Sequence, residues 1–221
     1  MKDATISELY DLTQTIAAFF VFCRIECFAE FKNKIFNERK HFPWIRFAFK
    51  DFCGENVWIA KDAVIAPTAS INGPCIIGKG AEIRQCAFIR GNAIVGEGAV
   101  VGNSTELKNV ILFNKVQVPH YNYVGDSVLG YKAQMGAGSI TSNVKSDKKL
   151  VVVKGADEQI ETGLKKFGAM LGDEVEVGCN SVLNPGTVVG RNSNIYPLSC
   201  VRGVIPSGHI FKNAKEIVKK I

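Results

Sequence analysis

The hydrophobic positions of the chain recur every six residues over its middle and C-terminal parts. The first series holds nine aliphatic residues: Ile59, Ile65, Ile71, Ile77, Ile83, Ile89, Val95, Val101 and Leu107. Small residues follow four positions after most of these anchors, and the rhythm returns between Leu171 and Val201. A period of six matches neither a helix face nor an amphipathic strand. It predicts a coil of three short parallel strands per turn, in which each inward side chain stacks on its counterpart one coil later.

This pattern divides the chain into three parts. Residues 1–53 lack the repeat, and a capping-box pattern at Thr5 followed by apolar residues at helical spacing predicts an α-helical N-terminal extension. Residues 54–206 are predicted to form one continuous parallel β-helix with an insertion loop at about 144–163. Residues 207–221 are expected to form a short C-terminal helix. The predicted fold class is therefore all-β, with small helical additions at both ends.

Two segments outside the repeat are open to more than one interpretation. The insertion at about 144–163 is expected to contain a short hairpin, which could cover a neighbouring active site or be a surface insertion without a role. The aromatic residues between Phe28 and Phe52 are too dense to stay exposed. We expect them to cap one end of the coil or to pack on a neighbouring subunit.

Composition limits the partners of the protein. The chain has 221 residues and a formal net charge of +6, but no run of Lys or Arg exceeds two residues, so small anions are expected rather than nucleic acid. The longest apolar run near the N-terminus is too short to cross a bilayer and no signal-peptide pattern occurs, so no membrane partner is expected. The seven cysteines lack metal spacing and favour reduced thiols in the cytoplasm.

The stretch 118–143 interrupts the repeat and carries the candidate chemistry. It holds His120, one of three histidines in the chain, with Tyr123 three residues later. Irregular backbone on a rigid repetitive scaffold is a usual place for functional residues. A lone histidine beside tyrosines is, without further context, more often structural than catalytic.

Four connected segments resemble the hexapeptide-repeat acyltransferases: NSTELKN (103–109), PHYNYVGDSVLG (119–130), GAGSITSN (136–143) and KKFGAMLGD (165–173). Within that superfamily they are most similar to the acetyltransferase domain of the bifunctional glucosamine-1-phosphate acetyltransferase/N-acetylglucosamine-1-phosphate uridylyltransferase, and to the tails of archaeal sugar-1-phosphate nucleotidylyltransferases. The resemblance covers about residues 54–206. It implies a left-handed coil, a homotrimer, and acetyl transfer from acetyl-CoA to the amine of a small-molecule amino-sugar phosphate.

The resemblance also implies roles for individual residues. His120 matches the catalytic histidine, which would act as a general base on the sugar amine. The positions that match substrate contacts are Arg90, Lys108, Tyr123, Gln134 and Lys166, with Lys149 competing for the last role. The positions assigned to the coenzyme are Ala137, Gly138, Cys179 and Pro197. Gln134 stands where the family has asparagine and Cys179 where it has serine, and no coenzyme-binding arginine is found after residue 206.

These residue types suit acetyl transfer. A sugar ammonium must lose a proton before it attacks a thioester, and imidazole is a suitable base near neutral pH. Arg90 and Lys108 can hold a phosphate, although either could also be a solvated surface charge. Backbone N–H groups of the turn 136–138 are candidates for stabilising the thioester oxyanion.

Two other functions remain open. A γ-type carbonic anhydrase would need three histidines around zinc, and His41, His120 and His209 lie in three different parts of the chain. A non-catalytic trimeric scaffold, or a partner for a separate nucleotidyltransferase, fits the replacements at Gln134 and Cys179. It also fits the lack of a glycine-rich nucleotidyl-transfer loop ahead of the repeat.

Overall fold

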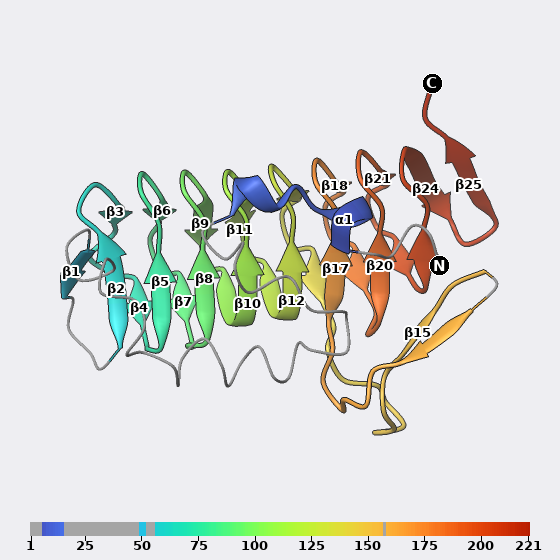
Figure 1. Cartoon of the computed structure of the whole chain (residues 1–221), viewed down its shortest axis with the longest axis horizontal. Coiled ribbons are helices and arrows are strands. Elements are labelled where there is room, and N and C mark those ends of the chain that lie inside the picture. The colour runs from blue at the N-terminus through green and yellow to red at the C-terminus, as the bar shows by residue number, and fades with distance from the viewer. Residues whose placement is uncertain (1–5, 16–48, 52–55, 157) are drawn as a thin grey trace.

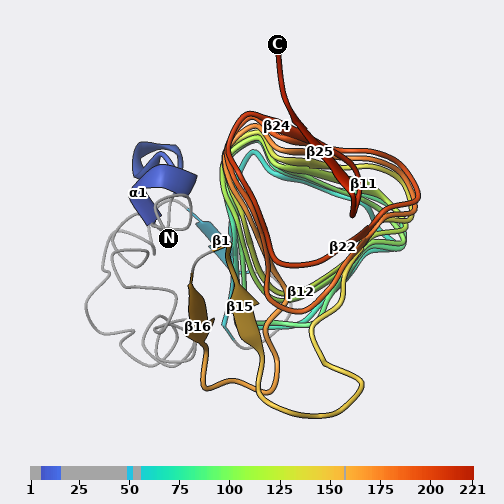
Figure 2. The ribbon, with the colours of Figure 1, turned by 90° about the vertical axis from the view of Figure 1, so that its right-hand side faces the viewer.

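The computed structural model describes residues 6–15, 49–51, 56–156 and 158–221. From β2 onward these residues wind into a parallel β-solenoid whose coils stand in a row along the long axis (Figure 1). The cross-section of the coil is a triangle with three flat faces (Figure 2). The predicted six-residue repeat and the all-β fold class are confirmed.

Each face of the triangle is a ladder of parallel strands from successive coils. Face 1 consists of β3 (Val64–Ile65), β6 (Glu82–Ile83), β9 (Val100–Asn103), β11 (Gln117–His120), β13 (Gln134–Met135), β18 (Glu176–Val177), β21 (Asn194–Ile195) and β24 (His209–Asn213). Face 2 consists of β4 (Ser70–Ile71), β7 (Phe88–Ile89), the first halves of β10 (Glu106–Leu112) and β12 (Tyr123–Leu129), β14 (Ile140–Thr141), β19 (Val182–Leu183) and β22 (Cys200–Val201). Face 3 consists of β2 (Val57–Ala60), β5 (Cys75–Ile77), β8 (Ala93–Val95), the second halves of β10 and β12, β17 (Ala169–Leu171), β20 (Thr187–Val189) and β23 (Val204–Ile205), and β1 (Phe49–Asp51) pairs with β2 in the antiparallel direction.

The core is the stack of inward aliphatic side chains that the repeat predicts. The side chains from Ile77 to Leu107 at six-residue spacing are at most 1% exposed. Ile65 and Ile71, in the first coil, are only partly buried. Because apolar burial is the main favourable contribution to folding, the repeat itself stabilises the coil.

The coil shortens by one residue just before the segment that carries His120. Phe88 pairs with Glu106, eighteen residues later, whereas Glu106 pairs with Tyr123, seventeen residues later. The missing residue comes from the corner between faces 2 and 3, so β10 and β12 run through that corner as strands of seven residues. A single left-handed residue makes each bend, Asn109 (φ 53°) in β10 and Asp126 (φ 49°) in β12. Asn and Asp tolerate this conformation better than most residues.

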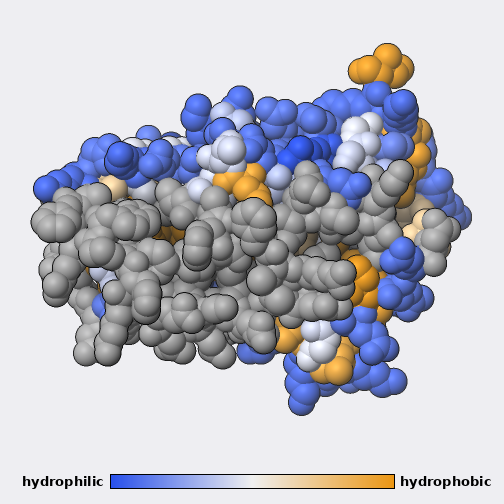
Figure 3. Space-filling model, viewed as in Figure 1, coloured by the Kyte–Doolittle hydropathy of each residue, from blue (hydrophilic) through white to orange (hydrophobic). Residues whose placement is uncertain are grey.

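The insertion contains the predicted hairpin. Strands β15 (Val152–Lys154) and β16 (Gln159–Glu161) pair in the antiparallel direction, and the hairpin stands outside the row of coils (Figure 1). Val151 and Val153 are fully buried, and the backbone of β15 lies close to Gly186, where a side chain would collide with Val152 O. Hydrophobic side chains also reach the surface in this part of the molecule (Figure 3).

Only the start of the predicted N-terminal helices lies among the described residues. A short helix α1 (Ile6–Leu9) is followed by a 3₁₀ turn η2 (Leu12–Gln14) that Asp11 caps. The described helix thus ends at Leu9, and the ring of Tyr10 packs on that of Phe113 with the two ring centroids 5.1 Å apart. The other expected helical and aromatic residues, 16–48, lie outside the described residues. No helix in the described ranges is long and apolar enough to cross a membrane.

The C-terminal helix expected for residues 207–221 is also wrong. Strand β24 continues face 1, and β25 (Glu216–Lys219) folds back on it as an antiparallel partner. A coil that ended at β24 would leave a row of unpaired backbone groups, and β25 covers this edge. The final hairpin is therefore determined by tertiary pairing, which the helical propensity of the isolated segment does not reflect.

Candidate functional site

His120 is the last residue of β11, at the corner between faces 1 and 2. Its backbone is fixed, because its N–H donates to Asn122 Oδ1 at 3.1 Å and its carbonyl accepts from Gly138 N–H at 3.0 Å. The residue is exposed, and its imidazole forms no hydrogen bond within the described part of the chain. A ring on a fixed backbone without a protein partner is available to a ligand.

The residues at the same corner of successive coils form a column on the surface. Asn103, His120, Ala137, Cys179 and Pro197 occupy equivalent positions. The next residue of each coil has a positive φ, including Tyr121 (φ 52°) and Gly138 (φ 70°). The predicted base His120 and three residues assigned to the coenzyme, Ala137, Cys179 and Pro197, thus lie at the same corner of successive coils.

Asn122 holds this corner in place, and the sequence analysis missed it. Its side chain is 2% exposed and its Nδ2 donates to Gly136 O at 2.8 Å and to Ser139 O at 3.1 Å. It occupies the small-residue position of the repeat, where the neighbouring coils have Thr105 and Ser139. An amide in that position was the signal that could have found it.

The turn 136–138 offers one free backbone donor rather than three. Gly136 N–H donates to Val177 O at 2.7 Å, and Gly138 N–H donates to His120 O at 3.0 Å. Ala137 N–H has no acceptor among the described residues, while its carbonyl accepts from Asn180 N–H at 2.8 Å. Of the candidate oxyanion donors in this turn, only the Ala137 N–H is left without an acceptor among the described residues.

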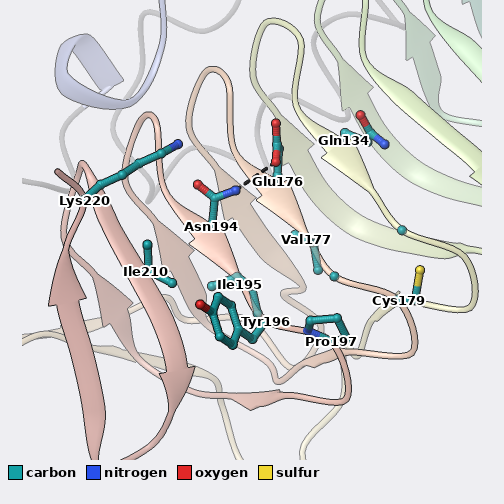
Figure 4. Close-up of a pocket in the computed structure, with 12 residues that line it drawn as sticks. Gln134, Glu176, Val177, Cys179, Asn194, Ile195, Tyr196, Pro197, Ile210 and Lys220 are labelled. Atoms are coloured by element: carbon teal, nitrogen blue, oxygen red, sulfur yellow. Dashed lines mark hydrogen bonds between the residues drawn. The ribbon is translucent and has the colours of Figure 1, made fainter.

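A groove of about 540 Å³ lies on face 1 beside this column. Its lining includes Gln134, Gly136, Cys179, Pro197 and Lys220. Cys179 and Pro197 lie at one end, and Lys220, which follows β25, reaches in at the other end (Figure 4). The structure thus places Gln134, which was expected to contact the acceptor, in the same groove as two of the residues assigned to the coenzyme.

The other predicted substrate residues gather on face 2 as a cationic cluster, which we define as Arg90, Lys108, Tyr123 and Lys166. Arg90 Nη1 pairs with Glu106 Oε1 at 2.7 Å, and this pairing raises the pKa of Arg90. The pKa of Lys108 is lowered, first by partial burial and then by repulsion from the neighbouring Lys166. Burial also raises the pKa of Tyr123, whose hydroxyl lies where a side chain at Gly125 would be.

Lys166 reaches the cluster because of the way the chain re-enters the coil after the insertion. Phe167 N–H donates to Asn143 O at 3.0 Å, and Gly168 N–H donates to Asp126 O at 2.8 Å. A side chain at Gly168 would collide with Gly125 O, so only glycine fits. Lys149 instead lies in the insertion, where its backbone N–H donates to Asp147 Oδ1 at 3.1 Å.

His120 lies at the corner between face 1, which carries the groove, and face 2, which carries the cationic cluster. Strand β11 ends face 1 at His120, and β12 begins face 2 at Tyr123, with two residues between them.

His209 lies in the last coil, where its Nδ1 is 2.8 Å from Ser207 O. Within the described ranges no three His, Cys, Asp or Glu side chains gather as metal ligands do, and His41 lies outside those ranges.

Comparison with known families now identifies the fold unit. The model of the GMPPB C-terminal domain matches residues 71–189, more than half of the chain. The chain belongs to the GMPPB C-terminal domain family. The matched segment of this family domain includes His120, the cationic cluster and the insertion.

Individual relatives of the family domain agree with the resemblance found in the sequence. A bifunctional sugar-1-phosphate nucleotidylyltransferase/acetyltransferase of Sulfurisphaera tokodaii is 36% identical over 112 residues, which cover 51% of this chain and 28% of that protein. A bifunctional protein GlmU of Methanococcus aeolicus is 35% identical over 120 residues, which cover 54% of this chain and 29% of that protein. The matched region therefore spans less than a third of the length of these curated relatives.

Solved structures include proteins with lower similarity to this chain. A hexapeptide transferase family protein from Anaplasma phagocytophilum is 19% identical with a TM-score of 0.43, covering 75% of this chain and 79% of that one. The acetyltransferase domain of PglB from Neisseria gonorrhoeae, solved in complex with acetyl coenzyme A, is 18% identical with a TM-score of 0.35, covering 74% of this chain and 57% of that one.

Proposed function

We propose that the protein is an acetyltransferase that moves an acetyl group from acetyl-CoA to the amine of an amino-sugar phosphate such as glucosamine 1-phosphate. The observation that carries this proposal is the position of His120, whose unengaged imidazole belongs to the corner between the face that carries the groove and the face that carries the cationic cluster. The name of the Sulfurisphaera relative, a sugar-1-phosphate nucleotidylyltransferase/acetyltransferase, supports acetyl transfer and sugar phosphates as the class of chemistry.

In this proposal the coenzyme occupies the groove on face 1. Its thioester lies near the column of His120 and Ala137, and Cys179 and Pro197 flank its thiol arm. Lys220 at the other end of the groove is positioned to meet the phosphates of the coenzyme. Ala137 N–H, the donor that the turn leaves free, stabilises the oxyanion of the tetrahedral intermediate.

The phosphate of the acceptor sits on the cationic cluster. Neither Lys108 nor Lys166 forms an ion pair with a carboxylate in the described residues, and the pKa of Lys108 is lowered by partial burial and then by repulsion from Lys166. A bound phosphate would remove this repulsion and accept charge-assisted hydrogen bonds from Arg90, Lys108 and Lys166. Tyr123 would add a neutral donor to the same group.

The chemical step follows from this arrangement. The ammonium group of the acceptor first loses a proton to solvent, and the neutral amine nitrogen then attacks the carbonyl carbon of the thioester while His120 accepts a second proton from that nitrogen. The C–S bond of the tetrahedral intermediate breaks, so that the acetyl group forms an amide with the sugar. The departing thiolate takes a proton from the imidazolium, which restores neutral His120 and releases coenzyme A.

We further propose that the protein works as a homotrimer in the cytoplasm, without a nucleic-acid or membrane partner. Two apolar side chains at the His120 corner are largely exposed, Tyr121 at 66% and Leu198 at 80%, and they suit contact with a neighbouring subunit. The four described cysteines are free thiols, which supports a reducing compartment. A monomeric mass by light scattering would contradict the trimer.

The test is a thiol-release assay with acetyl-CoA against a panel of amino sugars and their 1-phosphates. We expect release only with a phosphorylated amino sugar, because the cationic cluster must be filled for the amine to be placed at His120. If no acceptor gives release and calorimetry detects no coenzyme binding, the acetyltransferase proposal is wrong. The non-catalytic scaffold would then be the better account.

A further inference from the structure

The corner between faces 2 and 3 carries a ladder of polar side chains that ends at the cationic cluster. The ladder consists of Asn92, Asn109, Asp126 and Asn143, one from each of four successive coils. Asn92 Nδ2 donates to Asn109 Oδ1 at 2.9 Å, and Asn109 Nδ2 donates to Asp126 Oδ1 at 2.8 Å. Asn143 Nδ2 donates to Asp126 Oδ2 at 2.5 Å from the other side. Asn109 and Asp126 are buried.

The acid in this ladder fixes the direction of its neighbours. An amide has a donor end and an acceptor end, so a ladder of amides alone can run in one direction throughout. An ionised carboxylate only accepts, so both neighbours of Asp126 must turn their NH₂ groups toward it. The direction of donation along the ladder therefore reverses at Asp126. If the Asn143 amide turned over, its oxygen would face the carboxylate, acceptor against acceptor.

The orientation of Asn143 in turn determines where the Tyr123 proton points. Asn143 Nδ2 also lies 3.2 Å from Tyr123 Oη and donates to it. Because the phenol oxygen is the acceptor in this bond, its own proton is directed away from Asn143. The ring of Tyr123 lies over Gly125 on face 2, and its hydroxyl interacts electrostatically with Arg90 in the cationic cluster.

We propose that Asp126 is a positioning residue that, through Asn143, turns the Tyr123 hydroxyl outward so that it donates to an anion held by the cationic cluster. The identity of that anion as an acceptor phosphate rests on the proposed function. The existence of an anion site with Tyr123 as a donor does not rest on the proposed function, and titration with inorganic phosphate can test it directly.

Replacing Asp126 by asparagine makes this proposal distinguishable from simple charge repulsion. In Asp126→Asn the new NH₂ group faces Asn143, so the Asn143 amide turns over and presents its oxygen to Tyr123. The Tyr123 hydroxyl then donates its proton to the Asn143 oxygen and can no longer donate it to a ligand. Charge repulsion alone predicts the opposite change in phosphate affinity. Removing a carboxylate near an anion site would tighten phosphate binding.

The experiment is calorimetric titration of inorganic phosphate into the wild-type protein, Asp126→Asn, Tyr123→Phe and the double variant. We expect each single variant to bind about tenfold more weakly, the size of one hydrogen bond to a charged group. The double variant should bind like Tyr123→Phe, since both changes remove the same donor. Asn92→Gly is the matched control. It removes the far rung of the ladder at a left-handed residue (φ 50°) and should bind like the wild type.

Three outcomes would overturn the proposal: no phosphate binding by the wild type, equal or tighter binding by Asp126→Asn, or additive losses in the double variant. If Asp126→Asn does not fold, Asn143→Ala takes its place in the same cycle with Tyr123→Phe. Affinity of Asn143→Ala equal to that of the wild type would then contradict the proposal. Phosphate binding that follows this pattern without any thiol release would sustain the role of Asp126 while rejecting acetyl transfer.

Discussion

Two charged regions of the solenoid differ in how their charges are matched. At the corner near the N-terminal segment, Asp173 accepts hydrogen bonds from Asp11 N–H at 2.6 Å and Tyr131 N–H at 2.8 Å, and pairs with Arg191 at 3.1 Å. On face 2, Lys108 has another cation, Lys166, as its neighbour. In the first region a cation and two backbone donors match the carboxylate, whereas in the second Glu106 pairs with Arg90 and neither Lys108 nor Lys166 has an ion-pair partner among the described residues.

This difference indicates which region serves the fold and which serves a ligand. Burial raises the pKa of Asp173, while its backbone donors and Arg191 act in the opposite direction. Asp173 thereby ties residues 9–11 to two coils, because Asp173 N–H also donates to Leu9 O at 2.9 Å. In the cationic cluster Arg90 pairs with Glu106 of the next coil, but Lys108 and Lys166 are neighbouring cations, and an anion from outside would offset the repulsion between them.

The largest expected effect comes from removing both lysines of the cluster. Lys108→Met together with Lys166→Met should weaken binding of a phosphorylated acceptor about a hundredfold or more, since each lysine contributes a charge-assisted hydrogen bond. Calorimetry with glucosamine 1-phosphate measures this change. The control is Lys132→Met together with Lys115→Met, which alters two lysines beside Tyr131 and should leave binding unchanged. Equal losses in both pairs would mean that overall charge matters rather than this site.

Removing the carboxylate of Asp173 should lower the stability of the fold and leave phosphate binding unchanged. Asp173→Ala leaves two backbone N–H groups and Arg191 without their acceptor, which is expected to cost about 2–3 kcal/mol of unfolding free energy. Denaturant unfolding measures this loss, with the adjacent exposed Glu174→Ala as a control. Phosphate affinity should not change, and a loss of affinity as large as that of the lysine pair would remove the distinction between the two regions.

A smaller effect concerns the dependence of stability on pH. Because the pKa of Lys108 is lowered below 10.5 in the folded protein, the unfolded chain binds more protons between these two pKa values. Stability contributed through Lys108 therefore rises with pH through this window. The increase should be smaller in Lys108→Met, and unfolding curves at several pH values up to 10.5 can detect it. A steeper rise in the variant would contradict the lowered pKa of Lys108.

The sequence predicts the coil well because one short rule determines it. Aliphatic residues at every sixth position must face a common interior, and the side chains from Ile77 to Leu107 do so. The rule does not extend to the chain ends. The segment after residue 207 has helical propensity, but the edge of face 1 recruits it as β24 and β25. Propensity is local, and the need to pair an open strand edge is not.

The positions of the candidate site residues could be predicted where the six-residue repeat is unbroken, and could not be predicted where an insertion or a shortened coil interrupts it. His120, Ala137, Cys179 and Pro197 fall in one column because equivalent positions of the coils repeat. The position of Lys166 beside Lys108, and of Lys149 in the insertion, required the structure, because the insertion interrupts the register between β14 and β17. Asp126 was not singled out because its role depends on the hydrogen bonds of two neighbouring coils, which sequence spacing does not reveal.

The central claim is that acetyl transfer takes place at the corner between the face that carries the groove and the face that carries the cationic cluster, with His120 as the base. The most direct test compares thiol release by the wild-type protein and by His120→Ala at saturating acetyl-CoA and glucosamine 1-phosphate. We predict a loss of turnover of about a hundredfold or more, with phosphate affinity and subunit assembly unchanged. Full turnover in His120→Ala would contradict the account.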